Sequence, residues 1–197
     1  CRLRAVYGID RIDGFVIPKA RPEMLPDWIS LLNGTRLNLM PTMETPDLFD
    51  PTRLIQFRDL LLAAGPERIA AVRIGGNDLL GAMALRRVRG VISYEGPLAW
   101  FLSMAAGLLI PSGSPVAAPV FDIIEDLETL RREVERDVQM GFVSKTAIHP
   151  AQVPVIEGAL AVPPEELAAA EAILAGDARA VFQVGGDMCE PATHAAW

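Results

Sequence analysis

Five polar side chains stand where short apolar segments of the chain end: Lys19, Glu44, Asp78, Asp122 and His149. Two of them, Glu44 and Asp78, are carboxylates that could share one divalent cation. Mg²⁺ suits such a pair, because it takes one or two protein carboxylates and keeps its other positions for water and substrate oxygens. An ordinary alternative is that both acids cap the helices that follow them. The residue types alone leave both interpretations open.

Two basic residues near these acids could meet an anionic substrate. Lys19 could pair with a carboxylate or a phosphate, or it could be a solvated loop lysine. Arg73 lies inside the apolar run 69–74, where a buried guanidinium needs a partner. That partner could be a substrate carboxylate held by two hydrogen bonds, or a nearby acid such as Glu44. His149 precedes a proline and suits a structural role as well as a catalytic one, and His194 is predicted to be inert.

The elements that must position these side chains alternate along the chain. Apolar runs predict strands at 12–19, 37–43, 69–74, 116–121 and 142–148. Helical spacing and start or stop residues predict helices at 23–32, 50–65, 79–85, 96–110, 126–140, 152–160 and 164–174. Five strand–helix alternations indicate a parallel sheet with crossover helices. The carboxyl ends of parallel strands share one edge, so we expect the five polar residues to converge there.

Two architectures fit five such units. One is an open doubly wound sheet, and the other is part of a (β/α)8 barrel. A complete barrel needs about 250 residues, and this chain has 197. The chain starts at Cys1 rather than at a methionine, so we expect a fragment or a processed chain.

One helix and one basic cluster carry charged residues outside the strand ends. The helix at 126–140 carries an apolar stripe of Leu127, Leu130, Val134 and Val138, with charges elsewhere. The cluster Arg86-Arg87-Val88-Arg89 is read as a solvated or helix-end feature. The tail from 178 to 197 is broken by glycines and is expected to be partly irregular.

Composition excludes several classes of function. A net charge of −7 without long acidic blocks argues against nucleic-acid and anionic-membrane partners. The most apolar stretch, 98–110, is too short to span a bilayer. Glycine-rich phosphate loops and a GxSxG nucleophile motif are missing from the sequence. The two cysteines lie far apart, which favours no disulfide or zinc site and a reducing, cytoplasmic compartment.

Five segments occur in the order of one known family. They are GFVIPK (14–19), MPTMETP (40–46), RIGGNDL (73–79), APVFD (118–122) and GFVSKTAIHPAQ (141–152). Together they resemble the HpcH/HpaI aldolase and citrate lyase beta-subunit superfamily, the C–C bond lyases of the TIM-barrel fold. The segment GFVSKTAIHPAQ is the most specific, and the likeness covers about residues 12–174.

The resemblance implies a (β/α)8 TIM-barrel fold of which this chain supplies about five βα units. It implies Mg²⁺, or Mn²⁺, held by Glu44 and Asp78, and aldol-type cleavage or condensation, often of a CoA thioester. A lid carboxylate, often from a neighbouring subunit, would be Glu190, where the family has an aspartate. The family's opening strands and their substrate-clamping arginine have no counterpart here. Either the N-terminal third is lost, or another chain completes the barrel.

We therefore expect a partial barrel over 1–176 and a C-terminal lid over 177–197. The expected function is a Mg²⁺-dependent C–C bond lyase acting on a 2-hydroxy or 3-hydroxy acid. In it, Lys19 and Arg73 would bind the anionic substrate, Arg73 and Glu190 would be catalytic, and the protein would be a homo-oligomer. The alternative is a non-catalytic barrel remnant that serves as a binding or assembly module. A phosphate-ester hydrolase on an open sheet is a third option, but its nucleophilic aspartate motif is missing from the sequence.

Overall fold

The computed structural model describes residues 11–196, and its main sheet has five parallel strands. The strands are β1 (Gly14–Ile17), β2 (Asn38–Met43), β3 (Val72–Ile74), β4 (Val116–Ala118) and β5 (Ser144–Lys145). Each strand pairs with the next one along the chain, in the order β1-β2-β3-β4-β5. A doubly wound sheet would reverse its strand order at some point, so the sequential order is that of a barrel segment. The fold is therefore α/β of the TIM-barrel type, with five βα units.

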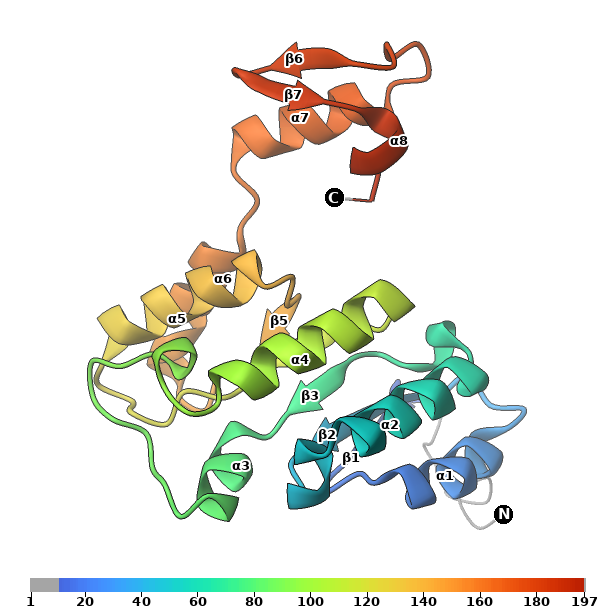
Figure 1. Ribbon diagram of the computed structural model, residues 1–197, viewed down its shortest axis with the longest axis vertical. Helices are drawn as coiled ribbons and strands as arrows, with labels where there is room; N and C mark the ends of the chain where they lie inside the picture. The colour runs from blue at the N-terminus through green and yellow to red at the C-terminus, as the bar shows by residue number, and fades with distance from the viewer. Residues whose placement is uncertain (1–10, 197) are drawn as a thin grey trace. The chain divides into compact units, whose positions relative to one another are not determined.

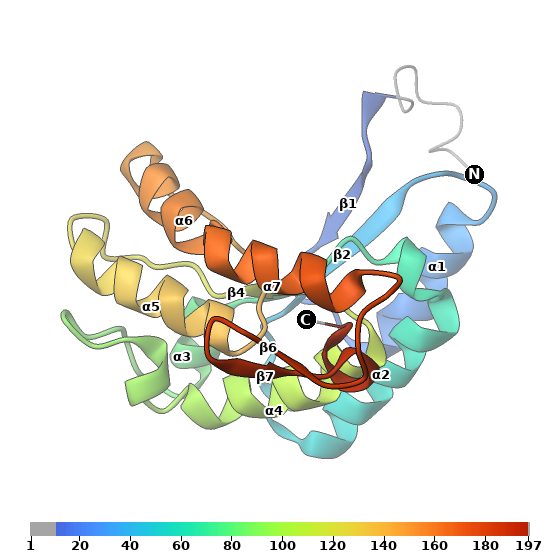
Figure 2. The ribbon, with the colours of Figure 1, turned by 90° about the horizontal axis from the view of Figure 1, so that it is seen from above.

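Helices follow the strands in turn, and α2, α4 and α5 lie along one side of the sheet (Figures 1 and 2). The α-helices of this part are α1 (Leu25–Leu32), α2 (Pro51–Ala64), α3 (Gly76–Ala82), α4 (Ala99–Leu109), α5 (Leu127–Gln139) and α6 (Val153–Leu160). Short 3-10 turns connect them: η3 (Pro22–Met24), η4 (Pro46–Phe49), η5 (Pro66–Arg68), η6 (Ser93–Glu95), η7 (Ile110–Ser112) and η8 (Pro150–Gln152). Helix α2 starts where the sequence predicts, because the Asp50 carboxylate accepts from the Thr52 N–H at 2.8 Å and Pro51 takes the first helical position.

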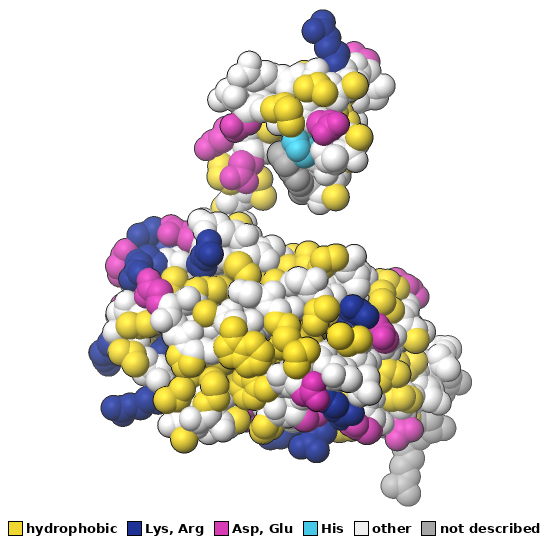
Figure 3. All heavy atoms as spheres, in the orientation of Figure 1, with side chains coloured by type: hydrophobic (Ala, Val, Ile, Leu, Met, Phe, Trp, Pro, Cys, Tyr) yellow, Lys and Arg dark blue, Asp and Glu magenta, His cyan; other side chains and the backbone are white. Residues whose placement is uncertain are grey.

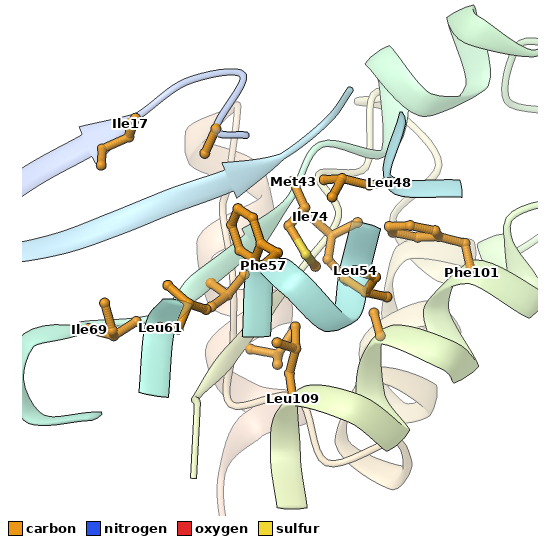
Figure 4. Close-up of a cluster of buried hydrophobic side chains, with 14 of the residues drawn as sticks. Ile17, Met43, Leu48, Leu54, Phe57, Leu61, Ile69, Ile74, Phe101 and Leu109 are labelled. Carbon is orange, nitrogen blue, oxygen red and sulfur yellow. The ribbon is translucent and has the colours of Figure 1, made fainter. Parts of the chain in front are cut away.

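The hydrophobic core lies between the sheet and these helices. Met43 and Ile74 of neighbouring strands point toward Leu54 and Phe57 of α2, and Leu109 of α4 closes the cluster (Figure 4). These five side chains are at most 3% exposed. The core thus fixes the side of the sheet on which the helices lie.

The opposite face of the sheet carries the alternate residues of each strand. The register aligns Thr42 of β2 with Arg73 of β3, and Arg73 with Ala117 of β4. Thr42 and Ala117 are buried, whereas Val16 near the β1 edge is half exposed. In a closed barrel this face would line the interior. The strands are shorter than predicted, since residues such as Ile12, Ile69 and Phe121 lie outside the assigned strands.

The chain divides into two compact units, one up to Leu160 and one from Ala161 onward. The second unit holds α7 (Pro164–Leu174), an antiparallel hairpin of β6 (Phe182–Val184) and β7 (Asp187–Cys189), and α8 (Pro191–His194). The tail that was expected to be partly irregular contains this hairpin. Gly185 and Gly186 both have positive φ, as a two-residue hairpin turn requires. Helix α7 belongs to the second unit, whereas the sequence-based boundary at residue 176 places it in the first.

Charges of both signs are mixed on the face of the molecule that Figure 3 shows. Lys and Arg side chains are dispersed among Asp and Glu over the viewed face (Figure 3). Within residues 11–196, none of the helices has the length and apolar character needed to cross a membrane.

Candidate active site

The ends of β2 and β3 bring Glu44 and Gly75 side by side. The Gly75 N–H donates to the Met43 carbonyl at 2.8 Å, which continues the parallel ladder one residue past β3. A Cβ on Gly75 would lie 2.3 Å from the Glu44 Cβ and 2.5 Å from its Oε2. The absence of a side chain at Gly75 therefore leaves the space that the Glu44 carboxylate occupies.

Lys19 connects the two predicted metal ligands. Its backbone N–H donates to Glu44 Oε1 at 2.6 Å, and its ammonium lies 2.6 Å from Asp78 Oδ1. Lys19 holds a left-handed φ of 49°, a strained conformation for a lysine that often marks a functional position. The Asp78 carboxylate holds the pKa of Lys19 above its ordinary value, through a hydrogen bond and charge attraction.

Asp78 is presented by the first turn of α3. This helix starts directly after β3, at Gly76, where an added Cβ would lie 2.7 Å from the Pro119 Cβ. Pro119 follows β4, so the start of α3 packs against the next strand's carboxyl end. The side chains of Lys19 and Asp78 are 65% and 45% exposed, which leaves both accessible to a ligand.

The pair Glu44 and Asp78 fits a hard divalent cation. Both carboxylates approach the same residue, Lys19, and Asp78 already accepts a cationic group at 2.6 Å. Within residues 11–196, no cluster of three or more His, Cys, Asp or Glu side chains could hold a metal. From the described residues a site here would draw two carboxylate ligands, a set that suits Mg²⁺.

Arg73 lies in the middle of β3, on the face of the sheet opposite the core residues Val72 and Ile74. Its neighbours in register are Thr42 and Ala117. It forms no ion pair with any residue in the described part of the chain, Glu44 included. A substrate anion thus remains the partner to consider for Arg73.

The other two polar residues at strand ends, Asp122 and His149, interact with neighbouring protein groups. His149 caps η8, with its Nδ1 accepting from the Ala151 N–H at 3.2 Å. Asp122 is ion-paired with Arg87, at 2.8 Å from Nε to Oδ1. That N–H does not point at the oxygen, so the contact is an ion pair without an aligned hydrogen bond. The structure brings Lys19, Glu44 and Asp78 together and gives Asp122 and His149 separate partners.

Glu190 belongs to the second unit, directly before α8. Its Oε2 accepts from the Thr193 hydroxyl at 3.1 Å, and its backbone N–H donates to His194 Nδ1 at 3.1 Å. The Glu190 carboxylate is thus oriented by its own segment.

A buried charge network in the first unit was not predicted. Arg87, interpreted from the sequence as part of a solvated or helix-end cluster, has a side chain only 3% exposed, and it pairs with the fully buried Glu133 at 2.6 Å. Glu133 also pairs with Lys145 at 2.8 Å, and Lys145 with Asp137 at 2.9 Å. The stripe predicted for α5 is corrected accordingly: Val138 is 45% exposed, while Glu133 and Asp137 face inward.

The pKa values of the two acids of this network are shifted in opposite directions. Glu133 has two cationic partners, Lys145 and Arg87, and they hold its pKa below the ordinary value despite its burial. Asp137 shares Lys145 with Glu133, and burial raises its pKa to about 6. The Tyr94 hydroxyl donates to Asp137 at 2.5 Å, and burial together with the charge of Asp137 raises the tyrosine pKa. The sequence feature that could have revealed this network is Lys145. It lies inside a predicted apolar strand, and a buried ammonium group requires acidic partners.

Comparison with known proteins identifies the family of this chain. Residues 2–197 match the family model described as C–C bond lyase of the TIM-barrel fold. The chain belongs to this C–C bond lyase family. The resemblance to the citrate lyase beta-subunit superfamily, drawn from the five sequence segments, is thereby confirmed.

The chain is similar to curated proteins and to solved structures. A (3S)-malyl-CoA thioesterase of Cereibacter sphaeroides is 32% identical over 108 residues, which cover 54% of this chain and 35% of that protein. The chain thus matches about a third of the length of this curated relative.

Solved structures share the fold of this family member. The CitE protein of Mycobacterium tuberculosis, in complex with magnesium, acetoacetate and coenzyme A, has a TM-score of 0.64 at 24% identity, covering 90% of this chain and 63% of that one. A citrate lyase from Burkholderia xenovorans has a TM-score of 0.68 at 22% identity, covering 91% and 59%. At these identities the likeness supports the fold and not the activity.

Proposed function

We propose that the protein is a Mg²⁺-dependent C–C bond lyase of the citrate-lyase-beta type. It would cleave or form a 2-hydroxy or 3-hydroxy acid, either free or as a CoA thioester. The observation that carries the proposal is the convergence of Glu44 and Asp78 on Lys19 at the carboxyl edge of the barrel strands. The family membership makes this chemistry the first to test.

Glu44 and Asp78 would hold the cation. Both are hard oxygen donors, and two carboxylates leave several positions for water and substrate, as Mg²⁺ prefers; Mn²⁺ would serve as well. When bound, the ion would supply Lewis-acid stabilisation of the negative charge that develops on the substrate oxygens. Gly75 would keep the Glu44 carboxylate in place by leaving it room.

Lys19 and Arg73 would bind the anionic groups of the substrate. Lys19 already contacts a carboxylate oxygen, at Asp78, and its side chain is mostly exposed. Arg73 is free of protein ion pairs in the described chain and projects from the face that lines the interior of a closed barrel. Its guanidinium can hold a substrate carboxylate with two parallel hydrogen bonds.

Glu190 would move the proton that C–C cleavage requires. In the cleavage direction a base removes the hydroxyl proton of the substrate, the C–C bond breaks, and an acid returns a proton to the carbon that keeps the electron pair. The Thr193 hydroxyl donates to Glu190 and would orient the carboxylate for this role. The protein would act as a homo-oligomer, because β1 pairs only with β2 among the described strands and leaves an open edge.

The relatives support the choice of substrates to be tested. The mycobacterial CitE structure was solved with magnesium, acetoacetate and coenzyme A, and a structure of a citrate lyase beta subunit from that organism was solved with oxaloacetate and magnesium. The curated relative is named a malyl-CoA thioesterase, so thioester hydrolysis is a second candidate reaction at the same site. The third candidate is a binding module without turnover.

A single panel of assays separates these candidates. The protein is incubated with Mg²⁺ and a set of 2-hydroxy and 3-hydroxy acids and their CoA thioesters, and both 2-oxo products and free thiol are measured. A lyase releases a carbonyl fragment, and Asp78→Ala abolishes the release. Release of free thiol together with the intact hydroxy acid would contradict the lyase and indicate a thioesterase. No turnover with any substrate would contradict both and favour the binding module.

A further inference from the structure

One buried arginine holds the whole segment that follows β4. Arg87 Nη2 donates to the Val120 carbonyl at 2.9 Å, and Nε lies 2.8 Å from the Asp122 carboxylate. Between these two residues, the Phe121 ring packs under the guanidinium, 4.6 Å from its centroid. Three consecutive residues therefore contact a single side chain that is itself 3% exposed.

The position of Arg87 is fixed from the other side by the buried charge network. Its Nη1 lies 2.6 Å from Glu133 Oε2, and the same oxygen accepts from the Ser93 N–H at 2.8 Å. The other Glu133 oxygen is taken by Lys145 of β5 at 2.8 Å. Glu133 cannot move without breaking these contacts, so Arg87 is anchored between α5 and the 120–122 segment.

The anchored segment leads directly to the candidate metal site. Pro119 directly precedes it and packs so closely against Gly76 that a Cβ at position 76 would lie 2.7 Å from the Pro119 Cβ. Gly76 is the first residue of α3, and Asp78 lies in the first turn of that short helix. Gln152 adds a second tie, because its amide donates to the Phe121 carbonyl at 2.8 Å.

We propose that Arg87 is a positioning residue for Asp78. Anchored by Glu133, it holds residues 120–122, and these hold Pro119 against the start of α3, which sets the direction of the Asp78 carboxylate. This inference rests on the proposed function, in which Asp78 binds the cation. Residues that support metal ligands in this way typically change metal affinity by about 10–100-fold when they are replaced.

The test uses Arg87→Lys, with Arg131→Lys as the matched control. Lysine keeps the charge beside Glu133, but it lacks the planar fork that reaches Val120, Asp122 and Glu133 together. Arg131 lies on the exposed side of α5, where it forms ion pairs with Glu128 and Glu135. The Kd for Mn²⁺ is measured by calorimetry, and folding is checked by thermal unfolding.

We expect a folded Arg87→Lys protein that binds Mn²⁺ about tenfold more weakly, with the control unchanged. Wild-type affinity in a folded Arg87→Lys protein would overturn the proposal. If that variant does not fold, the metal affinity of Asp122→Asn tests the proposal instead. Asp122 is 39% exposed, and its replacement leaves the buried ion pairs of Glu133 with Arg87 and Lys145 intact. A several-fold loss of affinity is expected for Asp122→Asn, and an unchanged affinity would overturn the proposal.

Hydrogen exchange distinguishes a failure of this inference from a failure of the proposed function. Amide exchange is compared at 120–122 and 76–82 in wild type, Asp122→Asn and Arg87→Lys, without any metal. Both segments should lose protection in the variants and neither should in Arg131→Lys. Faster exchange at 120–122 alone would show that the segment is not coupled to α3 and would overturn the inference. A wild type that binds no Mn²⁺ would instead count against the proposed function.

Discussion

At the scale of single residues, the site depends on a position without a side chain. Gly75 has an ordinary negative φ of −87°, so alanine is compatible with its backbone. The obstacle is Glu44, whose Cβ lies 2.3 Å from where an alanine Cβ would be. The glycine is required by the close approach of the glutamate and not by the turn.

Gly75→Ala should therefore displace Glu44 and weaken the binding of Mg²⁺ or Mn²⁺. Overpacking of this kind typically costs about 1–3 kcal/mol of stability, and we expect at least a tenfold loss of metal affinity in calorimetric titration. Gly81→Ala in α3 is the matched control, since nothing lies within 4 Å of its added Cβ. It should be neutral or stabilising by up to about 1 kcal/mol. Equal metal affinity in the two variants would show that Gly75 does not protect the position of Glu44.

Sequence reasoning could predict that Glu44 and Asp78 lie near each other, but it could not predict which residues hold them in place. Glu44 and Asp78 follow apolar strands, and the parallel topology alone requires them to lie along one edge. The sequence around Arg87 does not indicate that its side chain is buried. Arg87 stands between two other basic residues in a polar stretch, and only the fold shows that Glu133, 46 residues later, meets it at 2.6 Å.

At the scale of elements, α5 differs most from the prediction. The helix was expected to bury an apolar stripe and expose its charges. It buries Leu130 and Val134 as expected, but Glu133 and Asp137 lie on the same inward side. Helical periodicity identifies the buried side through its apolar members. It cannot show that a lysine from the next strand, Lys145, makes inward-facing acids acceptable.

Asp137→Asn should change how stability depends on pH. The native pKa of Asp137 is raised to about 6, above its ordinary value of about 3.9. Between about pH 4 and pH 6 the native state keeps a proton that the unfolded state releases. The contribution of Asp137 to stability is therefore lost as pH rises through this window and is constant above it. Across this window, the contribution of Asp137 to the free energy of unfolding falls by about 2–3 kcal/mol.

Chemical denaturation between pH 4 and 7 tests this prediction. Relative to Asp137→Asn, the free energy of unfolding of the wild type should fall as pH rises to about 6. Glu135→Gln, on the exposed side of the same helix, should follow the wild-type curve. Parallel curves for wild type and Asp137→Asn would mean that Asp137 titrates normally in the native state.

The order and type of the elements in the first unit were predicted more accurately than their lengths. Strand β3 has three residues and β5 two, where apolar runs predicted six and seven. An apolar run reports burial, and burial continues past the point where the strand pairing ends: Phe121 is buried beyond β4. The hairpin of β6 and β7 was missed because its strands are short and half exposed, so they show little alternation.

At the scale of the whole molecule, five sequential βα units form the part of the barrel that holds the candidate site. The strand order, which the sequence left open, is settled by the pairing of each strand with its successor. The second unit carries its own polar group, with Glu190 contacted by Thr193 and His194. The proposal therefore assigns metal binding to the first unit and proton transfer to the second.

Glu190→Gln should separate these two roles. Metal affinity should remain at the wild-type value, because Glu190 is not a proposed ligand. Turnover of the best substrate should fall by about 10²–10⁴-fold, the usual contribution of a general acid or base. Asp187→Asn, at an exposed position of the hairpin, should leave both quantities unchanged. A loss of metal affinity in Glu190→Gln, or full turnover, would contradict the assignment.

The most direct test of the central claim is a titration of Mg²⁺ and Mn²⁺ into the wild type, Asp78→Ala and Asp27→Ala. Asp27 is a suitable control, since it also lies exposed in the first turn of a helix, α1. With folding verified by circular dichroism, the wild type and Asp27→Ala should bind one ion per chain with equal Kd. Asp78→Ala should bind about 100-fold more weakly or not at all. Equal binding by Asp78→Ala and wild type would contradict the account.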